Sequence, residues 1–344
     1  MKNTPICFAS DANFIEQLRT ASFSAVYACR DGGPGLDVHI LDCGINDEVW
    51  TRYERELLEF AGRFGVSVSL VRHAIDLGAF SSYPTWTNGS RAIWARLLLP
   101  DLLPDEDVCV YSDCDMLFVE NPVAIVESMI RLEMLMVGHR NPFGSNGPDA
   151  LWFERNKLAY EADRYLCSGL IGLNLEELRK ARFVPAIFDF LKRYPKPVSV
   201  DQTILNWFCH GRTEVLDGGW GMFLHEAMSY EGQPKAIHYS GGYPWSHVKN
   251  AYDWVSRHCS QQATELINDF RVRIMGSEPF GRASAPRKDV VFGWGALTVT
   301  RILNFLRLPL PGHPCFSELV RSFDGSGAAI ERARSRLMDA GPDK

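Results

Sequence analysis

The sequence predicts an α/β fold in which a single mixed, mostly parallel sheet is flanked by helices and followed by a C-terminal helical extension. Short apolar runs alternate with segments of helical periodicity through the first half of the 344 residues. Hydrophobic residues make up 46% and charged residues 23% of the chain, which excludes a disordered protein. Sheets of this class bind ligands at the carboxyl ends of their strands, so we expect the site there.

The individual elements follow from apolar periodicity and from chain breakers. Residues 66–70 alternate polar and apolar side chains as a half-buried strand does, whereas residues 108–112 form an apolar run typical of a buried strand. The Gly-Gly-Pro-Gly segment at 32–35 ends the first helical segment, and Pro195 and Pro197 end a later one. In chain order, the expected strands are residues 6–9, 38–41, 66–70, 108–112, 135–137 and 169–173, and the expected helices are residues 14–28, 48–60, 90–99 and 175–193.

Charge and cysteine content exclude several classes of protein. The net charge of −6 argues against nucleic-acid binding, which requires a basic face. The nine cysteines are odd in number and form no Cys-x-x-Cys pair, so a disulfide scaffold or a zinc module is not expected. These features indicate a cytoplasmic protein, with a surface contact at the inner face of the membrane as the further alternative.

The last 80 residues differ from the rest in charge, which suggests a catalytic domain at 1–264 and an extension at 265–344. The extension carries a net charge of +3, against −9 for the preceding residues. Within it, residues 290–310 combine aromatic side chains with Arg301 and Arg307, a composition suited to an anionic membrane surface or a partner. Ordinary packing onto the catalytic domain is the equal alternative, and the apolar stretch at 290–300 is too short to span a membrane.

Two carboxylates follow the apolar strand at 108–112. Asp113 and Asp115 stand two residues apart, so in an extended chain their side chains point the same way. Like charges on a buried strand repel unless a cation lies between them, and oxygen ligands suit Mn²⁺ or Mg²⁺. A polar turn after a strand is the alternative, but the apolar residues 116–119 place the pair inside core-like sequence.

Other polar residues have both a functional and a structural interpretation. His238 precedes a glycine turn and is either a third metal ligand or a buried core histidine. Asp201 and Gln202 open a helical run, where Asp201 alone would be an ordinary helix cap. Arg96 lies on a helical segment and is either a ligand-binding cation or a surface residue.

Taken together and in this order, these segments resemble glycosyltransferase family eight, over residues 6–245. The family consists of retaining, metal-dependent enzymes with a GT-A-type nucleotide-sugar-binding fold. The sequence is similar to the bacterial galactosyl- and glucosyltransferases that build lipopolysaccharide or lipooligosaccharide cores. The resemblance therefore implies a donor such as UDP-galactose or UDP-glucose, a saccharide or glycolipid acceptor, and Mn²⁺ or Mg²⁺ as cofactor.

The resemblance also implies a role for particular residues. Asp113, Asp115 and His238 match the family's metal ligands, Asp201 would bind donor-sugar hydroxyls, and Gln202 would lie near the anomeric carbon. Arg96 would contact the donor phosphate or sugar, and the Phe14 ring would stack on uracil. The other residues implied in donor binding are Ala9, Asp11, Asn13, Ser112, Cys167, Ser168, Gly169, Gly241 and Tyr243.

Two departures from the family pattern concern donor binding, and a third, Arg140 or Asn141 where the family has an acidic residue, concerns the acceptor. Cys167 stands where the family has an asparagine that contacts the donor sugar, and Tyr243 stands where it has a lysine. A thiol is a weaker hydrogen-bonding group than an amide, so the donor sugar stays open. The nearest lysines are Lys235 and Lys249. Two alternatives also stay open, a nucleotide-sugar-binding protein with weakened catalysis and a metal-dependent phosphohydrolase that uses the same Asp pair.

Overall fold

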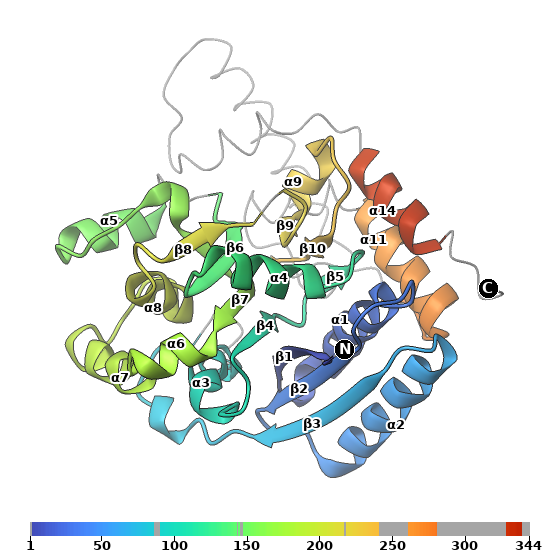
Figure 1. Cartoon of the computed structure of the whole chain (residues 1–344), viewed down its shortest axis with the longest axis horizontal. Helices are drawn as coiled ribbons and strands as arrows, with labels where there is room; N and C mark the ends of the chain where they lie inside the picture. The colour runs from blue at the N-terminus through green and yellow to red at the C-terminus, as the bar shows by residue number, and fades with distance from the viewer. Residues whose placement is uncertain are drawn as a thin grey trace, which may run out of the picture. The chain divides into compact units, whose positions relative to one another are not determined.

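The structure is a computed structural model of the chain, divided into two compact units at residues 1–217 and 218–344 (Figure 1). The residues that it describes are 2–85, 90–142, 144, 147–216, 218–240, 261–280 and 328–338. The boundary expected at 264/265 falls within helix α11 (Gln261–Asp269), and the separate role of the extension stays a prediction.

A seven-stranded sheet forms the centre of the first unit, in the order β3-β2-β1-β4-β7-β6-β8. All neighbouring strands are parallel except β7, which runs antiparallel to β4 and to β6. The mostly parallel sheet expected from the sequence is confirmed. The strands are β1 (Thr4–Ser10), β2 (Leu36–Asp42), β3 (Val68–Ala74), β4 (Val108–Ser112), β6 (Met136–Arg140), β7 (Leu166–Asn174) and β8 (Thr213–Val215).

The strand order changes direction between β1 and β4. The chain builds outward from β1 to β2 and β3, then returns to place β4 on the other side of β1. Cys7 pairs with Tyr111 and Phe8 with Ser112, so the loops that follow these two parallel strands leave the same edge of the sheet. Such a switch point is where open α/β sheets bind ligands.

Helices cover both faces of this sheet (Figure 1). One face carries a continuous apolar core in which Tyr111 and Leu173 of the sheet pack with Trp94 and Ile204 of the covering helices. Gly172 points to the opposite face, where an added Cβ would meet Ile125 and Met129 of α4 at 3.0 and 3.2 Å. The helices of the first unit are η1 (Ala12–Phe14), α1 (Ile15–Ala28), α2 (Asp47–Arg63), η2 (Gly78–Phe80), η3 (Ala92–Leu98), α3 (Leu99–Leu102), α4 (Val123–Leu132), α5 (Pro148–Arg155), η4 (Ala162–Arg164), α6 (Leu175–Lys180), α7 (Phe183–Arg193) and α8 (Val200–Phe208).

Two helical expectations need correction. The single helix expected over residues 175–193 is two helices, α6 and α7, separated at Arg182, whose φ of 56° is left-handed. Pro185 is the physical reason, because it donates no N–H and its ring would clash with the carbonyl four residues earlier, yet it fits the first turn of a new helix. Residues 92–98, expected as an ordinary helix, form the 3₁₀ helix η3.

In the second unit, β9 (Met222–Phe223) pairs in parallel with β10 (Ala236–His238). Helix α14 (Ala328–Met338) packs against α9 (Leu224–Ser229) and α11, and α11 continues as the π-helix η5 (Phe270–Met275). The C-terminal helical extension is thus confirmed where the structure describes it. Among the described helices, none is long and apolar enough to cross a membrane. The segment 290–310 lies outside the described residues.

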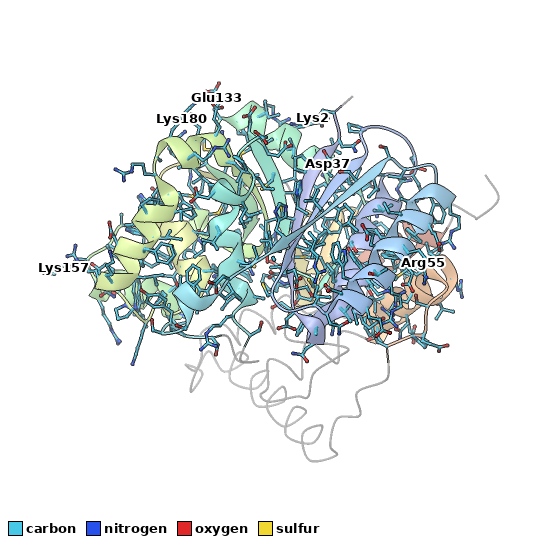
Figure 2. All side chains as sticks on the ribbon, turned by 90° about the horizontal axis from the view of Figure 1, so that it is seen from below. Lys2, Asp37, Arg55, Glu133, Lys157 and Lys180 are labelled. Atoms are coloured by element: carbon cyan, nitrogen blue, oxygen red, sulfur yellow. The ribbon has the colours of Figure 1, made fainter. Side chains whose placement is uncertain are left out.

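Charged side chains lie on the outside of the first unit, as Lys2, Arg55 and Lys180 show (Figure 2). The cysteines within the described residues are all free. They are Cys7, Cys29, Cys43, Cys109, Cys114, Cys167 and Cys209.

Candidate active site

The candidate site lies where β1 and β4 end and β7 begins. Asp113 and Asp115 follow β4 directly, before the short strand β5 (Met116–Phe118), and both are partly buried. The backbone N–H of Asp113 donates to the Gly169 carbonyl at 2.7 Å, and the Cys114 thiol donates to the Ala9 carbonyl at 3.2 Å. One backbone hydrogen bond to β7 and one thiol hydrogen bond to β1 therefore hold the Asp-x-Asp turn between these two strands.

Arg96 of η3 connects the acidic residues of the site. Its side chain is 3% exposed, so the alternative of a surface arginine is wrong. Nη2 donates to Asp113 Oδ1 at 2.7 Å, Nη1 donates to the Ser168 carbonyl at 2.7 Å, and Nε lies 3.2 Å from Asp201 Oδ2. The guanidinium also stacks over the Tyr111 ring at 4.3 Å. Arg96 thus orients two carboxylates, and its expected contact with a donor stays a prediction.

The positive charge of buried Arg96 is balanced by the carboxylates of Asp113 and Asp201. Burial by itself would lower the pKa of Arg96, but the carboxylates of Asp113 and Asp201 outweigh burial and raise it. Burial raises the pKa of Asp201, and Arg96 opposes this rise. The Tyr111 hydroxyl, whose pKa is raised well above its ordinary value by burial, donates to Asp113 Oδ1 at 3.1 Å. Arg96 therefore stays charged, and Asp113 is held through Oδ1.

A strained turn brings Asp201 and Gln202 to the site at the start of α8. Val200 has a φ of 43°, a left-handed conformation that a β-branched residue rarely adopts. Asp201 lies in the first turn of the helix rather than at its cap, which Ser199 occupies. The backbone N–H of Ser168 in β7 donates to Gln202 Oε1 at 3.2 Å. The two residues predicted from the Asp-Gln pair therefore lie beside β7 and Arg96.

Sequence reasoning missed the buried carboxylate of Asp149 beside this helix. Asp149 accepts hydrogen bonds from the hydroxyls of Tyr165, Ser199 and Thr203 at 2.5, 2.6 and 2.9 Å. In the sequence, Asp149 reads as an ordinary acidic residue in the first turn of a helix that begins at Pro148. Only the fold shows that two segments distant in the sequence, at Tyr165 and at residues 199–203, converge on it.

The loop after β1 is organised by Asp11. Its carboxylate caps η1 by accepting from the Asn13 N–H at 2.9 Å, and it also accepts from the Ser90 hydroxyl at 3.0 Å. Asn13 is exposed and Phe14 is partly buried. The loop lies at the carboxyl end of β1, next to β4, which is the position that a nucleotide-binding loop requires.

The remaining expected residues are more dispersed. Cys167 is buried in β7, and Ser112 ends β4. In the second unit, His238 ends β10 and is buried, with its ring 5.1 Å from that of Phe223. Lys235 holds its ammonium 5.8 Å from the Trp220 ring centroid. Gly241, Tyr243 and Lys249 lie outside the described residues.

The acidic pair fits a hard divalent cation. Asp113 and Asp115 offer carboxylate oxygens, the ligand type that Mg²⁺ and Mn²⁺ prefer. Asp113 is oriented from behind by Arg96 and Tyr111, as metal-binding carboxylates are in other proteins. The donor set and its orientation are therefore compatible with the expected metal.

A mostly parallel sheet with an Asp-x-Asp turn at its switch point defines a GT-A-type fold, the class of nucleotide-sugar glycosyltransferases. The sequence profile described as Glycosyl transferase family 8 matches residues 5–249. The chain belongs to this family and is a glycosyltransferase, as the resemblance in the sequence implied.

Solved structures share this fold at low sequence identity. The galactosyltransferase LgtC, in complex with donor and acceptor sugar analogues, has a TM-score of 0.59 and 18% identity, covering 83% of this chain and 98% of LgtC. The bifunctional glycosyltransferase WbbM has a TM-score of 0.57 and 15% identity over 80% of this chain and 52% of its own. GlyE of Streptococcus pneumoniae TIGR4 has a TM-score of 0.51 and 17% identity over 82% of this chain and 66% of GlyE. Comparison with curated protein sequences gives no match.

Proposed function

We propose that this chain transfers a hexose, galactose or glucose, from a UDP-sugar to a saccharide or glycolipid acceptor such as a lipopolysaccharide core, with retention at the anomeric carbon. The observation that carries the proposal is the contact of buried Arg96 with buried Asp201 and partly buried Asp113, beside Gln202 at the switch point of the sheet. LgtC, which shares this fold, is a galactosyltransferase solved in complex with donor and acceptor sugar analogues, which supports the substrate class.

In this proposal Asp113 and Asp115 hold Mn²⁺ or Mg²⁺, with His238 as the third ligand. When bound, the metal supplies positive charge that stabilises a leaving diphosphate. Arg96 and Tyr111 keep the Asp113 carboxylate in one orientation, so the ligand needs little rearrangement on binding.

The remaining residues bind and orient the donor sugar. Asp201, fixed by Arg96, accepts hydrogen bonds from sugar hydroxyls. Gln202 presents a neutral amide near the anomeric carbon, and because an amide is a poor nucleophile we propose direct attack by the acceptor hydroxyl on the face that the leaving group departs from. The departing phosphate then takes the hydroxyl proton. The loop of Ala9, Asp11, Asn13 and Phe14 binds the uridine.

Release of UDP tests the proposal. Purified chain is incubated with a panel of UDP-sugars and Mn²⁺, against a chelator control, and UDP is measured. We expect slow, metal-dependent release from one donor, which also identifies the sugar. Asp115→Asn should abolish release, whereas Asp163→Asn, which removes an exposed carboxylate elsewhere in the first unit, should not. Full activity in the Asp115 variant, or equal release with chelator, would contradict the metal assignment.

Cys167 favours a second candidate function, nucleotide-sugar binding with weakened transfer. The thiol stands in β7, one residue before Ser168, where the family pattern has a better hydrogen-bonding amide. Mn²⁺-dependent UDP binding without release from any donor or acceptor mixture would support this candidate. Recovery of release by Cys167→Asn would then assign the loss to this one side chain.

For the extension we propose peripheral contact with an anionic membrane through residues 290–310. The support is compositional: aromatic residues alternate with Arg301 and Arg307. The full chain should float with anionic vesicles and not with neutral ones, and Arg301→Glu with Arg307→Glu should reduce flotation. Equal flotation of the variant and the unaltered chain would remove this part of the proposal.

A further inference from the structure

The buried carboxylate of Asp149 lies outside the groups that the proposed mechanism uses. Asp149 belongs to α5, and the residue is 6% exposed. Within the described part of the chain, its side chain accepts hydrogen bonds from three hydroxyl groups, those of Tyr165, Ser199 and Thr203. Burying a carboxylate is unfavourable unless hydrogen-bond donors compensate for the lost water. The three hydroxyls stabilise Asp149 in this way, and Asp149 in turn fixes their positions.

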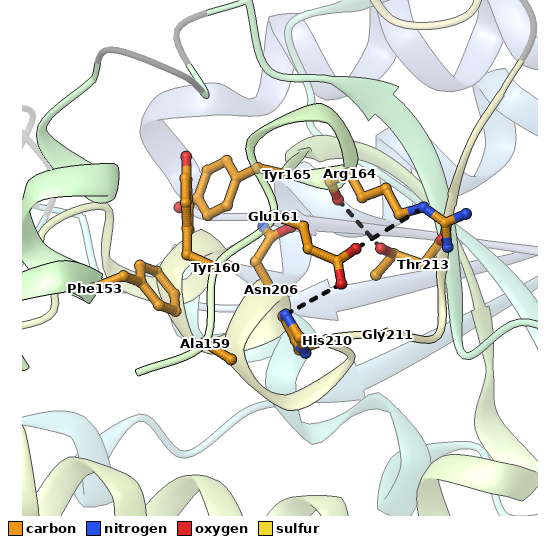
Figure 3. A pocket seen from close by; sticks show the side chains of 10 residues that line it. All are labelled: Phe153, Ala159, Tyr160, Glu161, Arg164, Tyr165, Asn206, His210, Gly211 and Thr213. Atoms are coloured by element: carbon orange, nitrogen blue, oxygen red, sulfur yellow. Dashed lines mark hydrogen bonds and ion pairs between the residues drawn. The ribbon is translucent and has the colours of Figure 1, made fainter. Parts of the chain in front are cut away.

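Tyr165 links this carboxylate to the amide of Gln202. The Tyr165 hydroxyl donates to Asp149 Oδ1 at 2.5 Å, and its oxygen accepts from Gln202 Nε2 at 3.5 Å. The Tyr165 ring cannot move freely, because it packs against Tyr160 and Phe153 with centroids 5.1 and 6.1 Å away, at the edge of a small pocket (Figure 3). Asp149 therefore fixes where the Tyr165 proton points.

This arrangement allows only one orientation of the Gln202 amide. The Ser168 N–H donates to Gln202 Oε1, which leaves the amide nitrogen facing Tyr165. A flipped amide would place its NH₂ group against the Ser168 N–H and its oxygen against a tyrosine oxygen whose proton is already given to Asp149. Both contacts would lose a hydrogen bond, so the carboxylate selects the amide orientation through the tyrosine.

The same carboxylate also holds the backbone turn that presents Gln202. Ser199 and Thr203 lie on either side of Val200, the residue with a φ of 43°. Both hydroxyls donate to Asp149, and Thr203 Oγ1 also accepts from the Ser199 N–H at 2.9 Å. A strained turn persists only when its surroundings fix it, and strain of this kind is concentrated at functional sites.

We propose that Asp149 is a positioning residue for sugar transfer: through Tyr165 it sets the orientation of the Gln202 amide, and through Ser199 and Thr203 it holds the turn that carries Gln202. The inference rests on the proposed function, because it assigns a purpose to the placement of Gln202. Asp149 itself does not touch the reacting atoms.

The test compares Tyr165→Phe with Tyr53→Phe. Each variant loses one buried tyrosine hydroxyl, but Tyr53 donates to Ser22, away from the site. With the donor that the unaltered chain uses, Tyr165→Phe should lower kcat roughly ten- to a hundredfold with donor KM within about twofold, because misplacement of a reacting group costs rate more than binding. Asp149→Asn should give the same split, since its amide cannot accept three hydroxyls, whereas Tyr53→Phe should leave both constants unchanged.

A second readout does not depend on activity. If Tyr165 contacts Gln202, the double variant Tyr165→Phe with Gln202→Ala should shift the urea unfolding midpoint by less than the sum of the two single shifts. For Tyr53→Phe with Gln202→Ala, which do not contact each other, the shift of the double variant should equal that sum. Additive shifts for the first pair, or equal kcat losses in the two tyrosine variants, would overturn the positioning role. Absence of UDP release from the unaltered chain would instead refute the proposed function, and the unfolding cycle would still decide whether Tyr165 holds Gln202.

Discussion

Replacement of Arg96 by methionine tests whether one buried cation stabilises the acidic site. Methionine replaces the aliphatic part of the arginine side chain but carries no charge, so Asp201, whose side chain is 5% exposed, would keep a buried charge without its cation. Removing one partner of a buried ion pair costs about 3–5 kcal/mol. Asp113 is 28% exposed and can be rehydrated, so most of this loss should come from Asp201.

Urea unfolding at pH 7 with a chelator present measures the loss. Arg140→Met is the matched control, because Arg140 is 56% exposed in its pair with Asp163 and should cost roughly 0–1 kcal/mol. Adding Asp201→Asn to Arg96→Met removes the stranded charge, so the double variant should be more stable than Arg96→Met alone. A loss no larger than that of the control, or a double variant less stable than the single one, would refute the reasoning.

Three further predictions concern the sheet. His39 is buried and lies 3.0 Å from His73, and burial followed by the nearby His73 lowers its pKa to about 4. The unfolded chain therefore takes up the proton first, so about 2–3 kcal/mol of stability should be lost as the pH falls from 6.5 to 4, and His39→Gln should flatten this part of the urea profile. Gly172→Ala should lower the free energy of unfolding by about 1–3 kcal/mol, because its Cβ would lie 2.9 Å from Val137; an unchanged melting temperature would contradict this packing. Asn206→Ala should cost roughly 1–3 kcal/mol in urea unfolding, because the Asn206 side chain bonds both the N–H and the carbonyl of Leu166 at the start of β7; a neutral result would show that water replaces it.

Much of the fold could be predicted because its strongest signals are local. The strand at 108–112 and the helix expected at 48–60 follow from apolar periodicity, and the structure adds only the exact ends of the helix, Asp47 and Arg63. The antiparallel direction of β7 could not be predicted, because a buried apolar run reads the same in either direction. Pro185 could have predicted the break between the two helices at Arg182. The apolar spacing on either side of it, however, resembles that of one continuous helix.

Some residues of the candidate site could likewise be predicted from the sequence, and others could not. Asp113 and Asp115 stand out in the sequence because they interrupt an apolar run, whereas Asp201 and Gln202 stand out only through the resemblance to the family. Asp149 and Tyr165 lack such a signal, because an acid in the first turn of a helix and a tyrosine before a strand are common. Their importance arises only when α5, β7 and α8 come together, which is a property of the tertiary structure.

Arg96 resolves an electrostatic conflict that the proposed chemistry creates. In the proposed function, one carboxylate binds the metal and another binds sugar hydroxyls, yet Asp113 and Asp201 would repel each other and a diphosphate. A single guanidinium contacts both carboxylates, and burial strengthens its effect because water does not screen it. Lysine could not replace it, since one ammonium lacks the planar fork that reaches Asp113, Asp201 and the Ser168 carbonyl together. The site therefore depends on the geometry of Arg96 as much as on its charge.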